Sequence, residues 1–201
     1  SPMLEFEDNY PLSKLTTLQI GGPAKKFVNV KTQEELIEAI KYAKDQKLQY
    51  LVIGGGSNLL ISDEGVECFV IKNDIAGIEQ ISHPGGVILK VKSGTPLQQL
   101  VACTIHNGLS GLEKLTGIPG TLGGAVYGNA GAYGQTISDH ITKIIILNEA
   151  KNLFTLSKNE CNFGYRDSIF KKTHDTILEV HFQLELGDPH SLQQEAKDVL
   201  S

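Results

Sequence analysis

Seven glycines fall within the eighteen residues 117–134, and this density constrains the chain more than any other feature. Glycine has no Cβ, so a segment this rich in small residues leaves main chain exposed at a surface instead of filling a core. Ile118, Leu122, Val126 and Tyr133 interrupt the segment, and they are too apolar for a flexible linker, which is the alternative interpretation. We therefore predict that a long, thin ligand lies along residues 117–134.

The composition is that of an ordinary globular protein and excludes several function classes. With 201 residues, the chain is long enough for one domain or two small ones around a hydrophobic core. Its net charge of −5 and the lack of a Lys/Arg cluster argue against nucleic acid as a partner. No apolar run approaches the about 20 residues of a membrane span, and no secretory signal opens the chain. We expect a cytoplasmic protein with no membrane partner.

Three cysteines, Cys68, Cys103 and Cys161, stand far apart and form no CxxC pair. No histidine lies near them at the spacing of metal ligands, so we predict no metal site. We interpret them as buried, reduced thiols.

The first part of the chain reads as a β-α-β unit. Residues 27–30 form an apolar strand, and Thr32 with Glu35 has the spacing of a capping box that begins a helix. Leu36, Ile40 and Ala43 place one apolar stripe on that helix. Residues 50–53 are a short run of β-forming residues, and residues 66–72 predict another strand.

The second part predicts a mixed sheet with one well-marked helix. Thr95 as N-cap with Pro96 at the first position begins the helix, and Asn107-Gly108 ends it with glycine in the left-handed position. Five strands are predicted, two that flank the turn at residues 84–86 and three from alternation, and the fold class is therefore α+β. These strands cover residues 76–82, 87–91, 141–147, 153–156 and 176–186.

The last helical signal is a capping pattern at residues 191–194, Ser-Leu-Gln-Gln. It begins an amphipathic helix that reaches Ser201 without a stop signal. We expect this helix to lead into further material.

A second glycine cluster, Gly54-Gly55-Gly56-Ser57-Asn58, directly follows the predicted strand 50–53. Backbone N–H groups of such a run can converge on an anion, and Ser57 and Asn58 add side-chain donors, which suits a pyrophosphate. A tight turn that needs glycine for its geometry alone is the alternative. The cluster matches neither GxGxxG nor GxxxxGK[ST], so Rossmann and P-loop enzymes are disfavoured.

Arg166 lies in a short stretch with aromatic residues on both sides, FGYRDSIFK at residues 163–171. Its planar guanidinium can hold a carboxylate through two parallel hydrogen bonds. Pairing with a structural carboxylate such as Asp167 is the alternative. The following Lys171 and Lys172 either attract an anionic substrate or form a solvated charge pair.

Four stretches together resemble the UDP-N-acetylenolpyruvoylglucosamine reductase family. They are TLQIGG at residues 17–22, GGGSNLL at 54–60, GLEKLTGIPGTLGGAVYGNAGAYG at 111–134 and FGYRDSIFK at 163–171. The resemblance implies an FAD enzyme of peptidoglycan precursor synthesis, with the two-lobed flavin fold of vanillyl-alcohol oxidase and para-cresol methylhydroxylase. It also implies that NADPH reduces the flavin, which then passes hydride to the enolpyruvyl group of a UDP-sugar substrate to give UDP-N-acetylmuramate.

The resemblance also implies roles for individual residues. Arg166 matches the family's catalytic arginine, which stabilises the charge that develops during hydride addition. Tyr133 matches a tyrosine near the substrate. Residues 54–59 are expected to wrap the FAD pyrophosphate, and residues 118–125 to line the flavin and its phosphates. The expected FAD-binding residues are Gly54, Gly55, Gly56, Ser57, Asn58, Leu59, Ile118, Pro119, Gly120, Thr121, Gly123, Gly124, Ala125 and Gly131.

Two features of the family's pattern do not occur in this sequence. They are the Ser or Cys that donates the final proton and a glutamate near the C-terminus. We expect residues 3–73 and 74–188 to form two FAD-binding lobes and residues 189–201 to lead to a substrate domain that is absent. The chain alone should then turn over poorly, and a monomer is favoured. A non-catalytic FAD-binding module and another flavin oxidase of the same fold are the alternatives.

Overall fold

The computed structural model describes residues 4, 6–11, 23–54, 68–173 and 175–201. It divides the chain into two compact units, residues 1–75 and 76–201. Among the described residues, no helix is both long and apolar enough to cross a membrane.

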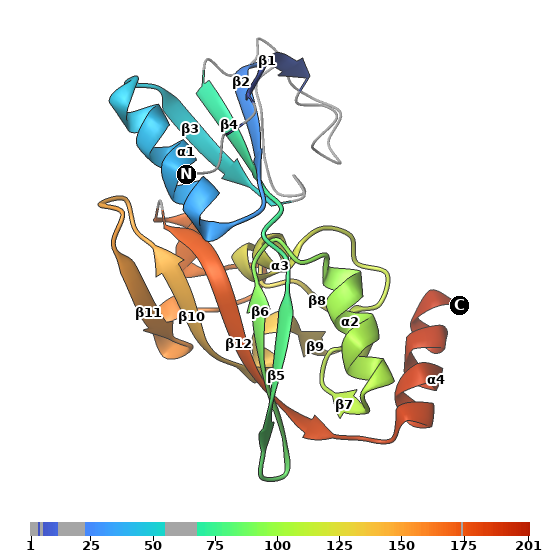
Figure 1. Cartoon of the computed structure of the whole chain (residues 1–201). Helices are drawn as coiled ribbons and strands as arrows, with labels where there is room; N and C mark the ends of the chain where they lie inside the picture. Colours follow the sequence, from blue (N-terminus) through green and yellow to red (C-terminus); the bar gives the residue numbers. More distant parts are fainter. Residues whose placement is uncertain (1–3, 5, 12–22, 55–67, 174) are drawn as a thin grey trace. The chain divides into compact units, whose positions relative to one another are not determined.

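The first unit is a four-stranded sheet with one helix (Figure 1). Its strand order is β1-β2-β4-β3, in which β1 pairs antiparallel with β2, and β4 pairs parallel with both β2 and β3. The predicted β-α-β unit is present, and β4 lies between its two strands. The elements are β1 Phe6–Pro11, β2 Pro23–Val30, α1 Gln33–Asp45, β3 Gln49–Ile53 and β4 Cys68–Asn73.

Helix α1 begins and packs largely as predicted. The Thr32 side chain accepts the Glu35 N–H at 3.1 Å, which is one half of the capping box. The Glu35 carboxylate contacts the Thr32 hydroxyl at 3.4 Å instead of its backbone N–H. Leu36, Ile40 and Ala43 are buried on α1, so the apolar stripe lies against the sheet.

The second unit is built on a six-stranded sheet in the order β11-β10-β12-β6-β5, with β7 paired to β12. All of these pairs are antiparallel. The predicted strands 141–147 and 176–186 are confirmed at both ends as β10 and β12. The strands are β5 Ile78–His83, β6 Gly86–Lys92, β7 Leu109–Ser110, β10 Ile141–Leu147, β11 Leu153–Ser157 and β12 Thr176–Leu186.

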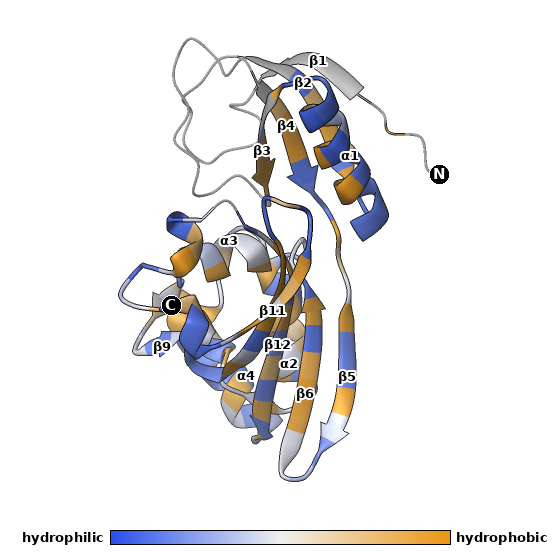
Figure 2. Ribbon diagram, turned by 90° about the vertical axis from the view of Figure 1, so that its left-hand side faces the viewer, coloured by the Kyte–Doolittle hydropathy of each residue, from blue (hydrophilic) through white to orange (hydrophobic). Residues whose placement is uncertain are grey.

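One face of this sheet forms the core. Alternate residues of β6, namely Val87, Leu89 and Val91, are buried, and Val180 and Phe182 of β12 join them in one cluster. Figure 2 shows the corresponding hydrophobic and hydrophilic bands along β12. The helices α2 and α3 contribute the other side of this core. They span Leu97–His106 and Leu122–Tyr127.

Two predicted helix starts are wrong. Helix α2 begins at Leu97 after Pro96, because the Thr95 hydroxyl accepts the N–H of Gly77 at 3.0 Å and does not cap the helix. Helix α4, Pro189–Leu200, begins earlier than the pattern at 191–194 suggested, because the Asp188 carboxylate caps it with Pro189 in its first turn. The predicted end of α2 is confirmed, with Gly108 at φ 64°.

Residues 189–201 pack within the second unit. Helix α4 lies beside α2 and contacts the 3₁₀ helix η2, Glu113–Leu115 (Figure 1). Its Leu192 is buried. The chain from 117 to 134 is also ordered, since it contains α3 and a small hairpin of β8, Gly131–Ala132, with β9, Gln135–Thr136.

Candidate functional site

Helix α3 lies in the middle of the glycine-rich segment, and its first N–H groups are engaged within the protein. Thr121 caps the helix by accepting the Gly124 N–H at 3.2 Å. The N–H of Leu122 donates to the Thr95 carbonyl at 2.9 Å, and that of Gly123 donates to the Ser93 carbonyl at 2.8 Å. The amides of residues 122–124 therefore do not offer an anion site of the kind that a helix N-terminus often provides.

Bare main chain on α3 still suits a flat ligand. Gly123 and Gly124 are half-buried and carry no side chain, so a planar ring could lie on the backbone there. A Cβ at Gly123 would lie 3.2 Å from the Ser93 carbonyl oxygen, so glycine also lets α3 approach residue 93 closely. With its amides engaged, this surface offers a place for a planar group but no backbone donors for a phosphate.

Tyr133 stands at the tip of the β8–β9 hairpin. Tyr133 and Gly134 form its two-residue turn, with φ of 52° and 80°, as a turn of type I′ requires. The Tyr133 side chain is 69 % exposed and is therefore open to a ligand. A Cβ at Gly131 would lie 2.9 Å from the Gln135 carbonyl oxygen, so the hairpin itself requires glycine there.

Arg166 lies in a tight turn between Gly164 and Asp167. The N–H of each of these two residues donates to the carbonyl of the other, at 3.1 and 3.2 Å. Arg166 adopts a left-handed φ of 49°, and its side chain is exposed. One guanidinium nitrogen, Nη2, donates to the Gly131 carbonyl at 2.9 Å. The exposed Tyr165 ring lies 5.7 Å from the guanidinium carbon.

Three hydrogen bonds join the end of α3 and the segment after it to residues 164–168, which include the turn that carries Arg166. The Ser168 hydroxyl donates to the Tyr127 carbonyl at 2.7 Å, and the Asn129 side-chain amide donates to the Gly164 carbonyl at 2.8 Å. The bond from Arg166 to Gly131 is the third. The structure thus brings two predicted site segments together, although about 35 residues separate them in sequence.

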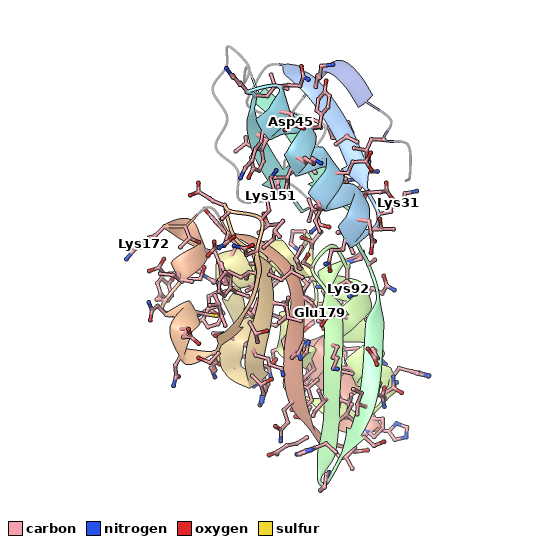
Figure 3. All side chains as sticks on the ribbon, turned by 60° about the vertical axis from the view of Figure 1, so that its left-hand side comes forward. Lys31, Asp45, Lys92, Lys151, Lys172 and Glu179 are labelled. Atoms are coloured by element: carbon pink, nitrogen blue, oxygen red, sulfur yellow. The ribbon has the colours of Figure 1, made fainter. Side chains whose placement is uncertain are left out.

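The alternative interpretation of Arg166 as the partner of Asp167 is not supported. In the part of the chain that the structure describes, Arg166 forms no ion pair with Asp167, and its guanidinium binds a backbone carbonyl instead. Lys171 donates from Nζ to the Arg166 carbonyl oxygen, so its ammonium holds the turn. Lys172 is exposed and extends away from the ribbon (Figure 3).

Glu113 is a buried residue that contacts the β8–β9 hairpin, which carries Tyr133. It was not identified from the sequence. It is 4 % exposed and accepts the Gly111 N–H at 2.8 Å and the Gln135 side-chain amide at 3.1 Å. Burial raises the pKa of Glu113, but these donors together lower it more, so the pKa lies below its ordinary value. The neighbouring Glu113 side chain raises the pKa of Glu195 on α4, as does burial.

The first glycine cluster is described only at its start. Gly54 directly follows β3, while Gly55, Gly56, Ser57, Asn58 and Leu59 lie outside the described residues. The predicted pyrophosphate site at residues 54–59 therefore stays a prediction.

Comparison with known proteins gives matches over most of the chain. A family model described as an FAD binding domain matches residues 24–152. The UDP-N-acetylenolpyruvoylglucosamine reductase of Carboxydothermus hydrogenoformans is 37 % identical over 198 residues, which cover 98 % of this chain and 64 % of that protein. The crystal structure of the reductase MurB from Thermus caldophilus has a TM-score of 0.77 and 34 % identity, over 98 % of this chain and 68 % of that one.

The chain belongs to the UDP-N-acetylenolpyruvoylglucosamine reductase family. A solvent-stable cholesterol oxidase shares the fold alone, with a TM-score of 0.68 and 14 % identity over 91 % of this chain and 38 % of that one. The predicted α+β flavin fold of the vanillyl-alcohol oxidase type is thus confirmed. The chain spans 64 % of the length of the reductase from Carboxydothermus hydrogenoformans.

Proposed function

We propose that the protein containing this chain is an FAD-dependent reductase of the enolpyruvyl group of a UDP-sugar, with NADPH as the reductant. One observation carries the proposal. Arg166 is the sole arginine among 18 basic residues of the sequence, and the structure presents it exposed on a turn held by three hydrogen bonds. Arginine differs from lysine in that its planar guanidinium can bind a carboxylate through two parallel hydrogen bonds.

Arg166 has the donors that this role needs. A guanidinium carries five N–H donors, and the Gly131 carbonyl engages one nitrogen, so another edge is free to bind the substrate carboxylate. FAD, when bound, supplies the two-electron hydride chemistry. Addition at the enolpyruvyl double bond moves negative charge toward the carboxylate, and a fixed positive charge there stabilises the transition state more than the ground state.

The remaining expected site residues are assigned by position. Ile118, Pro119 and Gly120 precede α3, and Thr121, Gly123, Gly124 and Ala125 belong to its cap and first turns; we propose that these residues line the flavin ring. Tyr133 is proposed to contact the substrate. The phosphates of FAD are assigned to residues 54–59, because the amides of residues 122–124 are engaged. The protein is expected to act in the cytoplasm, and the chain by itself is expected to turn over poorly.

Substitution of Arg166 tests the proposal in the full product of the gene that encodes this chain. R166K should lower kcat about 10²- to 10³-fold in NADPH oxidation with UDP-N-acetylglucosamine enolpyruvate. The reason is that the lysine ammonium is a point charge and cannot form the two parallel hydrogen bonds of the guanidinium. The bound flavin spectrum should not change. K172Q is the control, since Lys172 is exposed nearby, and its rate should stay within about twofold. Full activity of R166K, or a protein that binds no FAD, would refute the proposal.

A further inference from the structure

Asn129 contacts the turn that carries Arg166 from inside the protein. Its side chain is 7 % exposed, and its Nδ2 donates to the Gly164 carbonyl at 2.8 Å. The amide can have only this orientation, because the reverse one would place its oxygen against the carbonyl oxygen. The same Gly164 carbonyl accepts the N–H of Asp167, which closes the turn.

The segment that contains Asn129 fixes the turn at two points. Asn129 donates to the Gly164 carbonyl at the start of the turn. The carbonyl of Gly131, two residues further along, accepts a hydrogen bond from the Arg166 guanidinium. Asn129 itself has a left-handed φ of 43°, which asparagine tolerates better than most residues do. A displacement of Asn129 would therefore change both the position of the turn and the direction of the guanidinium.

The stability of the fold alone does not account for an asparagine at position 129. Among the residues that the structure describes, its buried Oδ1 has no hydrogen-bond partner. A buried acceptor without a hydrogen bond is destabilising, which offsets part of what the bond to Gly164 contributes. A residue that combines this cost with a left-handed backbone is more readily explained by the geometry that it imposes on its partner.

We propose that Asn129 is a positioning residue, which sets the direction of the Arg166 guanidinium through the Gly164 carbonyl. The proposal rests on the proposed function for its catalytic consequence, but its structural part can be tested separately. Asn129→Asp is the informative variant. It conserves shape and tolerance of the left-handed backbone, and it replaces the donor with an ionised oxygen that repels the Gly164 carbonyl.

The sole arginine makes the structural test direct. The chain labelled with ¹⁵N-arginine gives the side-chain NMR signals of Arg166 alone. N129D should shift the Arg166 Nε–H signal and speed its exchange with water, and acidification that protonates the introduced carboxyl should reverse both changes. N162D is the control, because Asn162 has a similar φ of 47° but is exposed. An Arg166 signal unchanged by N129D, or changed equally by N162D, would overturn the proposal.

N129G provides the same test if the Asp variant does not fold. It removes the donor and relieves the backbone strain together, so it should fold and still shift the Arg166 signal. An unchanged signal in N129G would also overturn the proposal.

A double-mutant cycle on the full gene product tests the catalytic consequence. N129D should lower kcat about 10- to 100-fold, since small misplacements of a catalytic group have effects of this size. On the R166K background it should add less than about twofold, because its effect passes through Arg166. Multiplicative losses would overturn the proposal. Full activity of R166K would instead refute the proposed function, and the NMR test would still decide the role of Asn129.

Discussion

The hydrogen-bonded group around Glu179 yields a stability prediction whose sign and size follow from the structure. Glu179 of β12 accepts Lys92 Nζ of β6 and His181 Nε2 of its own strand, each at 2.7 Å. Its side chain is 15 % exposed, whereas that of Lys92 is 44 % exposed. Figure 3 shows Lys92 and Glu179 on neighbouring strands of the sheet. Glu179→Gln removes the charge and conserves the shape.

The expected loss is moderate. A hydrogen bond to a charged group contributes about 1.5–3 kcal/mol, and solvent screening at the half-exposed Lys92 reduces this, so we expect E179Q to lose about 1–2 kcal/mol at pH 7. A protein of this size then melts about 2–8 °C lower. Burial raises the pKa of Glu179, but the donors Lys92 and His181 together lower it below its ordinary value.

The pH dependence follows from that direction. A carboxyl group with a lowered pKa in the folded state contributes stability above its unfolded pKa, and the contribution is lost as the pH falls through the folded value. The gap between E179Q and the parent should therefore close on acidification below the ordinary glutamate pKa of about 4.3.

The assay is thermal unfolding followed by far-UV circular dichroism, because the chain has no tryptophan. E185Q is the matched control, since Glu185 lies on the same strand and is exposed. A loss in E179Q that is equal at pH 3 and pH 7, or a similar loss in E185Q, would refute the reasoning.

Two further predictions concern a thiol and a glycine. Burial, with a smaller effect of Glu160, raises the pKa of the Cys161 thiol to about 11. A thiol reagent at pH 8 should therefore leave Cys161 unmodified in the folded protein while it labels the half-buried Cys103. Mass spectrometry of peptides before and after denaturation checks this, and fast labelling of Cys161 would contradict it. Gly111→Ala should destabilise by about 1–3 kcal/mol in urea unfolding, because φ is 134° and the His140 side chain, whose Cδ2 would lie 2.5 Å from the new Cβ, must move. A loss below about 0.5 kcal/mol would contradict this.

The elements that local pattern defines were predictable, and those that depend on distant partners were not. The alternation in β10 and β12 predicted both strands to the residue, and the helix stripe of Leu36, Ile40 and Ala43 was confirmed. The start of α2 was wrong, because the hydroxyl of Thr95 binds Gly77, 18 residues away. No local signal reports such a competing partner. The prediction that all three cysteines are buried fails at Cys103, which is half-buried.

The candidate site shows the same division. Its residue types were visible in the sequence, since an arginine between aromatic residues and a tyrosine in a glycine-rich stretch both stand out. The contact of Arg166 with the Gly131 carbonyl was not visible, because it joins residues 35 apart. Glu113 was missed for a similar reason, since its burial depends on packing beneath the β8–β9 hairpin.

The glycine-rich segment shows why composition alone does not identify a ligand site. Gly123 and Gly131 both lie where a Cβ would crowd the protein's own backbone, at 3.2 Å from Ser93 and 2.9 Å from Gln135. The fold thus requires glycine at Gly131 even without a ligand, and at Gly123 glycine permits the close approach of Ser93. The more discriminating observation is the sole arginine of the sequence, Arg166, whose guanidinium donates to the Gly131 carbonyl of the same segment. A cofactor cradle and a tight backbone crossing both need glycine, so the proposed anion site rests on the Arg166 guanidinium, which donates to the Gly131 carbonyl, and not on the glycines.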